Sequence, residues 1–467
     1  MKPTVARKLH NSKRRIARRL DKTKLGDCSR PMFSARNIRY EIGDRCRGIA
    51  HGGLGAIHLL VRQLGLIDAI DERLHLLKIH LPFHESDHVL NFAYNALCDG
   101  TCLQDIFDDV RIRVWARQPD AFFAQATIDM DGTLVATTGE CKRGMDIAYD
   151  GTWGYHPLVL SLANTHEVLR IVNRSGNRPS HEGAAAQVDR ALAVCFQGGF
   201  RRVRLRGDTD FSQTEHLDRW NADGRITFIF GYDSMPNLRA IAEALPERAW
   251  RKLERPPRYT VRTEPRRRPD RVKEQVVLAR LFDNQRLQSE EVAEFDYRPA
   301  ACQNSYRMVV VRKNISVEKG EQALFDQIVY FFYLTNDWGP EANEIVFEAN
   351  DRCDQENLLA QLRGGVRALT APVDNLVSNW AYMVMTGLAW NLKAWWALTL
   401  PEEPGRWQAK YRAEKLWLLR IEFKTFVNAF VRQACQVVRT GRQLVYRLLA
   451  WNPQQPIFFR LLSVLRC

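Results

Sequence analysis

The sequence predicts an α/β protein whose central core is interrupted by a β-rich segment and flanked by helical regions. Three observations predict this class. Apolar, strand-like runs follow one another from about residue 124. One helix-like pattern and two further strand-like patterns come after them. A Pro- and Arg-rich stretch at 251–271 separates this block from more β-like runs, and helical periodicity returns at about Asp354.

The two ends of the chain are strongly basic. The protein has 467 residues and a net charge of +14. Residues 1–48 carry 15 Lys or Arg against 4 Asp or Glu, and residues 406–467 carry 12 against 2, so the segment between them is acidic. This distribution predicts binding to a polyanion, with nucleic acid favoured over solubility alone. The densest basic cluster is a predicted DNA-binding arm: Lys13, Arg14, Arg15, Arg18 and Arg19.

The region from 50 to 115 is predicted to be helical. Ile57, Leu60, Val61 and Leu64 recur at the three- and four-residue spacing of one helix face. The most apolar segment, Trp380–Leu400, contains an amide and a lysine, so it predicts a buried helix instead of a membrane span. The N-terminus has no apolar stretch typical of a signal peptide, and we expect a cytoplasmic protein with no membrane partner.

The central block predicts a defined order of elements. Three consecutive strands, a helix and two more strands are expected at Thr127–Thr138, Met145–Tyr149, Leu158–Ala163, Glu182–Phe196, Arg202–Leu205 and Ile226–Phe230. Three strands in succession, a helix, a strand, more helix and a strand is the order of an RNase H-like core.

These patterns divide the chain into six predicted regions. They are a basic N-terminal DNA-binding arm (1–48), a helical N-terminal domain (49–123), a first core segment (124–234), a β-rich insertion (235–342), a second core segment (343–405) and a basic helical C-terminal region (406–467). Within the insertion, strands are expected at Gln275–Leu278, Tyr306–Val311 and Ile328–Leu334. Residues 406–450 are interpreted as a pair of basic amphipathic helices.

Three carboxylates from distant segments form the candidate site. Asp131 and Asp208 are predicted at strand ends, next to Gly132 and Gly207, which would let backbone or phosphate approach closely. Glu356 is predicted on a helix. At 100° per residue, Arg352 and Arg363 lie within about 40° of it, while Leu358, Leu359, Leu362, Val366 and Leu369 face the other side.

Carboxylates in a basic protein suit metal-dependent phosphoryl transfer. Hard divalent cations prefer oxygen ligands, and two ions about 4 Å apart can stabilise both the attacking and the leaving oxygen. We therefore expect two Mg²⁺ ions, with Mn²⁺ as a substitute, held by Asp131, Asp208 and Glu356, with Asp129 as the alternative to Asp131. Arginines beside such a site can hold phosphates through two parallel hydrogen bonds.

A phosphatase of the haloacid-dehalogenase type is the competing interpretation. The run Asp129-Met-Asp131-Gly-Thr133 matches the first motif of those enzymes, in which Asp129 would be the nucleophile. That scheme needs a lysine between the two acidic motifs, and Lys142 is the only one between Asp131 and Asp208. The expected consecutive hairpins also differ from the β–α alternation of such a fold.

The chain resembles the DDE transposases of bacterial insertion sequences, in the cut-and-paste group with a β-strand insertion. The resemblance covers roughly residues 50–450. The matching motifs are Asp129-Met-Asp-Gly-Thr133, Gly154-Tyr-His-Pro-Leu158, Leu205-Arg-Gly-Asp-Thr-Asp-Phe211, Tyr333-Leu-Thr-Asn336 and Arg352-Cys-Asp-Gln-Glu356.

The resemblance implies Asp131, Asp208 and Glu356 as the catalytic, metal-binding triad, with Arg352 and Arg363 on DNA phosphates. Two features depart from the family pattern. Ala349 stands where a tyrosine is common, and the stretch near Asp109–Val110 is several dozen residues short, which would make this an inactive copy if it is a deletion.

The mechanism that the resemblance implies is DNA cleavage and strand transfer at terminal inverted repeats. The partners are double-stranded DNA, as repeats and target, and a second copy of the chain. A flipped base could stack on Tyr259, Phe295 or Tyr297. The alternatives are a metal-dependent nuclease on the same core and a catalytically dead DNA-binding remnant, which would bind DNA in a salt-sensitive way without cleaving it.

Overall fold

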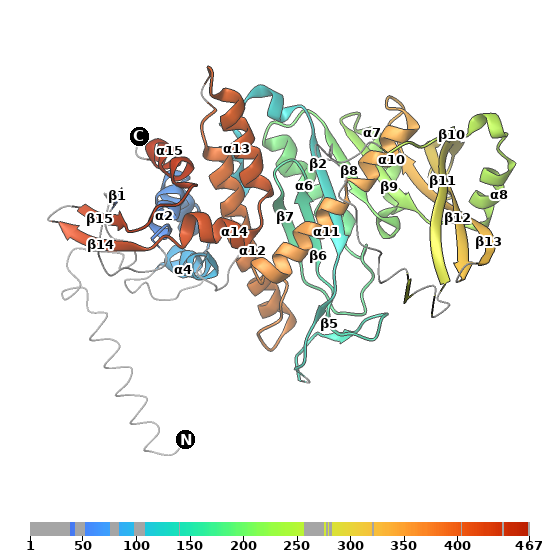
Figure 1. The fold of residues 1–467 in the computed structure, drawn as a ribbon. Helices are drawn as coiled ribbons and strands as arrows, with labels where there is room; N and C mark the ends of the chain where they lie inside the picture. Colours follow the sequence, from blue (N-terminus) through green and yellow to red (C-terminus); the bar gives the residue numbers. More distant parts are fainter. Residues whose placement is uncertain are drawn as a thin grey trace, which may run out of the picture.

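A large mixed β-sheet with helices packed against it forms the centre of the molecule (Figure 1). The computed structural model describes residues 38–42, 52–74, 84–97, 108–139, 141–255, 275–276, 279, 283–319, 322–402, 404–440 and 443–465. Among these, no helix is both long enough and apolar enough to cross a membrane.

The main sheet has nine strands in the order β10-β11-β12-β13-β9-β8-β2-β6-β7. Their bounds are β2 (Ala126–Gly132), β6 (Leu158–Leu162), β7 (Glu167–Val172), β8 (Val203–Gly207), β9 (Ile226–Tyr232), β10 (Arg251–Lys252), β11 (Asp283–Tyr297), β12 (Tyr306–Lys319) and β13 (Gln322–Thr335). Strands β2, β8 and β9 are parallel, and every other pairing in the sheet is antiparallel.

Helices cover this sheet and form a second body at the other end of the molecule. Around the sheet lie α6 (Ala184–Gln197), α7 (Thr214–Ala222), α8 (Pro236–Ala244), α10 (Ala342–Asn350) and α11 (Cys353–Ala360). The second body contains α2 (Leu54–Gln63), α3 (Leu66–Arg73), α4 (Glu85–Leu97), α5 (Asp108–Trp115), α13 (Gln408–Arg420), α14 (Phe423–Phe426) and α15 (Gln455–Leu465). The long helix α12 (Leu376–Thr399) contacts both β7 and α4, so it joins the two bodies.

Two small sheets and several short turns complete the chain. One sheet is β3 (Val135–Ala136), β5 (Trp153–Tyr155) and β4 (Asp146–Ile147), and the other is β1 (Ile38–Ile42), β15 (Gln443–Leu448) and β14 (Cys435–Thr440). The short helical turns are η3 (Asp120–Phe123), η4 (Thr209–Phe211), η5 (Glu247–Ala249), η6 (Gln361–Gly365) and η7 (Val427–Val431).

Helix α12 is the apolar segment that the sequence predicts to be buried. Its aromatic residues Trp390, Trp395 and Trp396 are almost fully buried. The two polar residues that argue against a membrane span are satisfied inside the protein. Asn391 exchanges hydrogen bonds with the backbone of Val168, and Lys393 donates to the carbonyl of Leu419.

The third strand of the core differs from the prediction. Only Asp146–Ile147 of the expected strand Met145–Tyr149 is extended, and it pairs in a small sheet outside the main one. The third core strand is β7, which the sequence analysis missed. Its buried Glu167 and Arg170 break the apolar pattern, and ion pairs to Arg111 and Asp108 are what allow them to be buried.

The prediction of two basic helices over 406–450 is wrong in its second half. Helix α13 is present, but Cys435–Thr440 and Gln443–Leu448 form the antiparallel pair β14 and β15. These segments are rich in Val, Leu, Tyr and Thr, and their β-branched and aromatic members favour strands. The helical periodicity that predicted a second helix does not extend beyond η7.

The segment interpreted as an insertion contributes three long strands to the main sheet. The strands predicted at Tyr306–Val311 and Ile328–Leu334 are present as β12 and β13, and β11 is an additional one. Strand β13 pairs with β9 through Leu334 and Phe230, so these strands continue the core sheet. Of the strand expected at Gln275–Leu278, residues 275 and 276 are helical, and 277 and 278 lie outside the described residues.

Candidate active site

The three predicted carboxylates come from two neighbouring strand ends and one helix. Asp131 lies near the end of β2, and Asp208 follows directly after β8. These strands are adjacent and parallel, so both side chains lie at the same edge of the sheet. Glu356 lies on α11, which contacts β2.

Arg352 joins two of these carboxylates. Its Nη1 lies 3.2 Å from Asp131 Oδ2, and its Nη2 lies 4.0 Å from Glu356 Oε1. The side chain of Asp131 is 15% exposed and that of Glu356 is 62% exposed. Asp208 accepts a hydrogen bond from the backbone N–H of Asp210 at 3.1 Å. The site is therefore open to solvent on the Glu356 side.

The charged forms of Asp131 and Asp208 are disfavoured by their surroundings. Burial raises the pKa of Asp131 to about 6; Arg352 opposes this, and the neighbouring carboxylates Asp208 and Glu356 add to it. Burial also raises the pKa of Asp208, again against the effect of Arg352. One guanidinium thus compensates only part of the negative charge gathered here.

The donor set fits a divalent cation in its chemistry. Carboxylate oxygens are hard ligands, and a cation would favour the charged form of Asp131, whose pKa is raised by burial and further by Asp208 and Glu356. Within the described part of the chain, no three acidic, His or Cys side chains stand close enough to hold one ion together. Arg352 donates to only one of the two oxygens of Asp131, Oδ2.

Asp129, the alternative to Asp131, is fully engaged elsewhere. It is buried, and both of its oxygens accept from Arg206, at 2.6 and 2.8 Å. Arg206 also donates to the carbonyl of Glu348 on α10. A buried carboxylate with two charge-assisted hydrogen bonds is a structural ion pair. It is poorly suited to be a metal ligand, or the nucleophile that the phosphatase interpretation requires.

The predicted helix face is confirmed on its apolar side, where Leu358, Leu359, Leu362, Val366 and Leu369 are all buried. On the polar side, Arg363 is exposed and its Nη2 donates to Thr133 Oγ1 at 2.7 Å and to the carbonyl of Leu134 at 2.9 Å. Arg352 and Arg363 therefore both reach the end of β2, but only Arg352 contacts carboxylates of the predicted triad.

Sequence reasoning missed Gln355, the residue whose hydrogen bonds to β6 position α11 relative to the sheet. Gln355 is buried, accepts from the Ser161 hydroxyl and donates to the carbonyl of Val159 at 3.1 Å. Ser161 and Val159 on β6 are the Cα partners of Asp129 and Asp131. Gln355 thus sets Glu356 beside the first aspartate, and its position next to Glu356 in the matching motif was the available signal.

The two glycines next to the aspartates have a different role from the expected one. A Cβ at Gly132 would lie 2.7 Å from His156 Nε2, and one at Gly207 would lie 2.7 Å from the Cβ of Phe211. The protein's own side chains therefore take the space that was expected to admit a phosphate.

The other residues predicted to contact DNA do not lie at the carboxylates or fall outside the described residues. Lys13, Arg14, Arg15, Arg18, Arg19 and Tyr259 fall outside the described residues. Phe295 and Tyr297 on β11 are partly buried and pack against the core, and Tyr297 contacts the ring of Tyr232. A role for either aromatic in stacking a base stays a prediction.

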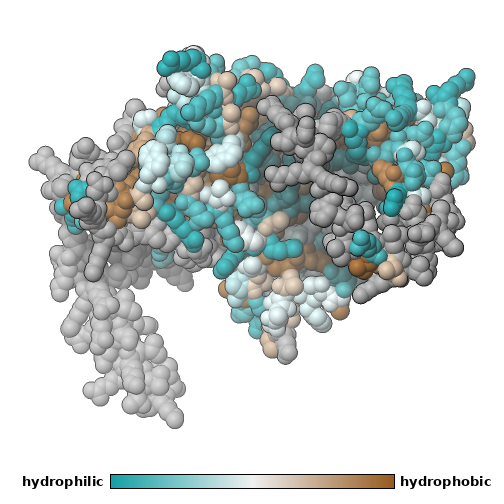
Figure 2. All heavy atoms as spheres, in the orientation of Figure 1, coloured by the Kyte–Doolittle hydropathy of each residue, from teal (hydrophilic) through white to brown (hydrophobic). Residues whose placement is uncertain are grey.

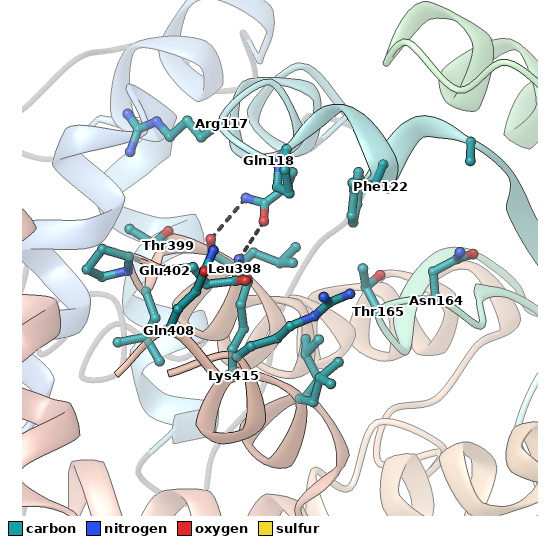
Figure 3. A pocket seen from close by; sticks show the side chains of 18 of the residues that line it. Arg117, Gln118, Phe122, Asn164, Thr165, Leu398, Thr399, Glu402, Gln408 and Lys415 are labelled. Atoms are coloured by element: carbon teal, nitrogen blue, oxygen red, sulfur yellow. Dashed lines mark hydrogen bonds and ion pairs between the residues drawn. The ribbon is translucent and has the colours of Figure 1, made fainter. Parts of the chain in front are cut away.

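A pocket of about 980 Å³ lies away from the carboxylates (Figure 3). Its lining includes Gln125 and Thr127, at the opposite end of β2 from Asp131. Lys415 reaches into it and is held by Gln118 at 2.7 Å and Glu402 at 3.0 Å. The polar groups of this pocket are therefore largely paired with one another.

Comparison with known proteins gives the family. Residues 110–467 match the model of the family described as "Transposase DDE domain group 1". The chain belongs to this DDE transposase family. The matched residues include β2, β8 and α11, which carry the three carboxylates.

A solved structure is also similar. It is the cryo-electron microscopy structure of the piggyBac transposase synaptic complex with hairpin DNA, with 12% identity and a TM-score of 0.37 over 82% of this chain and 85% of that one. No curated protein matches the chain.

Proposed function

We propose that this DDE transposase cleaves DNA at the ends of its own insertion sequence and transfers the freed strands to a target, with Asp131, Asp208 and Glu356 as its catalytic carboxylates. The observation that carries the proposal is the meeting of Asp131 and Asp208 at one sheet edge beside Arg352. The order of β2, β6, β7, β8 and β9 supports an RNase H-like core. A bacterial origin and a homodimer on DNA belong to the same proposal.

The chain's own residues divide the work. Asp131, Asp208 and Glu356 would hold Mg²⁺, with Mn²⁺ as a substitute; the ions would supply charge neutralisation and an activated water. Arg352 contacts Asp131 through one guanidinium nitrogen. With a cation held by the carboxylates, this guanidinium would be available to bind a DNA phosphate. Arg363 keeps the end of β2 in place through Thr133 and Leu134.

Cleavage of DNA tests the proposal directly. The substrate is a plasmid carrying this gene with several hundred base pairs on each side, incubated with the full chain and Mg²⁺. Asp208→Asn should reduce cleavage by about 10³-fold, because it removes a carboxylate that would hold the cation that neutralises the reacting phosphate, while DNA affinity stays within about threefold.

The matched control is Asp210→Asn, two residues further on at an exposed position, which should cleave like the wild type. Unimpaired cleavage by Asp208→Asn would overturn the assignment of this residue. Salt-sensitive binding without cleavage by the wild type would favour the dead remnant. Cutting without any joining to a target would favour the nuclease.

Thermal unfolding tests the metal without relying on activity. Mg²⁺ that binds only the folded state raises the Tm. We expect this rise above pH 6, where Asp131 is ionised, and a smaller rise below it, because the proton competes with the cation. Asp131→Asn should abolish the rise, and an equal rise in this variant would place the ion elsewhere.

A further inference from the structure

We propose that the small sheet β3-β5-β4 is a base-stacking platform, which holds an unpaired DNA base next to the cut through Trp153 and Tyr149. This inference rests on the proposed function. It concerns a lobe that follows directly after Asp131 in the chain and that the proposed chemistry does not use. Figure 1 shows β5 in this lobe, projecting from the edge of the main sheet.

The lobe exposes aromatic side chains that its own fold does not need. Trp153 is 54% exposed, and Tyr149 at the tip is 91% exposed. Ile147, 47% exposed, is the Cα partner of Trp153, so the two lie on one face. Figure 2 shows pale and brown residues mixed with teal ones on this lobe. Large aromatic faces in water at a strand tip are costly and need an occupant.

The base of the lobe is rigid. Arg143 N donates to the carbonyl of Asp374 at 2.8 Å, and the Tyr155 hydroxyl donates to the carbonyl of Arg143 at 3.0 Å. The tip is a tight turn in which Gly151 has a φ of +85°, a conformation that favours glycine. A platform fixed in this way loses little entropy when a ring stacks on it.

The charged side chains around the lobe favour DNA as its ligand and indicate how the DNA would lie. Arg363, Arg367 and Arg143 are exposed, and among the described residues Arg143 and Arg367 have no ion-pair partner. Arg363 contacts Thr133 and Leu134, which link Asp131 to the lobe, and Arg143 lies in the lobe itself. They suit phosphates. The tip instead carries Asp146 and Asp150, which repel phosphates, so the aromatic rings would meet the faces of bases.

The lobe is within reach of the cut. The backbone N–H of Thr137 donates to the carbonyl of Trp153, and Thr137 lies six residues beyond Asp131. An extended chain rises about 3.3 Å per residue, so Thr137, the hydrogen-bond partner of Trp153, lies at most about 20 Å from Asp131, or about six nucleotides of B-form DNA. The stacked base therefore belongs to the DNA immediately flanking the cleaved bond.

The experiment uses the full chain in EDTA and DNA from the element's ends with 2-aminopurine, a fluorescent base, at single positions within six nucleotides of the cut. Stacking on an aromatic ring quenches this fluorescence. The variant is Trp153→Ala with Tyr149→Ala. The control is Trp451→Ala, 70% exposed between β15 and α15 at the other end of the molecule.

We expect the wild type and the control to quench at one or two positions, and the double variant to lose the quenching with at least a fivefold loss of affinity for DNA unpaired there. Equal quenching by all three proteins would overturn the platform while leaving cleavage intact. A double variant that binds DNA normally but loses self-association in light scattering would overturn it in favour of a protein contact. A wild type that binds no DNA would overturn the proposed function as well.

Discussion

Asp129 and Asp131 lie two residues apart on the same face of β2, and their surroundings are opposite. Asp129 is buried with two short hydrogen bonds from Arg206. Asp131 has one longer side-chain contact, to Arg352. Burial raises the pKa of both carboxyls, so the difference lies in their hydrogen bonds. Both aspartates pair with an arginine, so the pairing alone does not separate structure from function. The number of hydrogen bonds that each carboxylate accepts does separate them, because a carboxylate with an unused acceptor position can still bind a ligand.

The largest effect on stability is expected at the buried ion pair of Asp129 and Arg206. Arg206→Ala should lower the free energy of unfolding by about 3–5 kcal/mol, because it leaves Asp129 buried without its partner. Arg352→Ala should cost only about 0–1 kcal/mol, since its partners are partly in solvent. Urea denaturation measures both. Similar losses for the two variants would break the comparison.

The double variant Asp129→Leu with Arg206→Met is the control for this prediction. Replacing a buried ion pair by apolar residues of similar size is often neutral, so it should recover most of the loss. A double variant as unstable as Arg206→Ala would mean that the hydrogen bond from Arg206 to Glu348 carries the effect.

Asp131→Asn should stabilise the protein, whereas Arg206→Ala, which leaves Asp129 without its partner, should destabilise it. The folded-state pKa is about 6 against an unfolded value of about 4, so the stability that protonation lends is complete below about pH 4 and is lost as the pH rises through 6. At pH 8 without metal, the variant should therefore gain about 1–3 kcal/mol.

Urea denaturation at pH 4 and pH 8 checks the sign. The gain should vanish at pH 4, where both forms are neutral. Asp296→Asn, at an exposed position on β11, should show no gain at either pH. A variant less stable than the wild type at pH 8 would mean that the contact with Arg352 outweighs the burial of charge.

The smallest stability effect is expected at Arg363. Its guanidinium is exposed, so Arg363→Ala should change the free energy of unfolding by at most about 0.5 kcal/mol. Cleavage should nevertheless fall by about tenfold, because the end of β2 loses its hydrogen bonds at Thr133 and Leu134. Arg363→Lys, which keeps the charge, should restore less than half of the rate.

The sequence predicted where the three carboxylates lie in the fold, and their catalytic role stays a prediction. Asp131 and Asp208 each follow an apolar run and precede a turn, so local pattern was enough to place them at strand ends. Glu356 needed the periodicity of its buried leucines. The role of Asp129 could not be read this way, because its partner Arg206 is 77 residues distant and only the parallel pairing of β2 and β8 brings them together.

The missed elements have a common physical cause. Strand β7 contains Glu167 and Arg170, and these look like surface residues until the ion pairs from α5 are known. Strands β14 and β15 follow a helical segment in the sequence, and the prediction continued that helix into them. In both cases long-range partners, which local propensity does not contain, decide the structure.

The pairing of β13 with β9 has a consequence for anyone who would shorten this protein. Residues Ile229–Tyr232 are hydrogen-bonded to Phe332–Thr335, so β9 has no free edge. Removing the intervening strands would leave a row of unpaired amide and carbonyl groups beside apolar side chains, which favours aggregation. The segment that interrupts the core in sequence is thus a permanent component of its sheet, and a shortened version of this protein has to keep it.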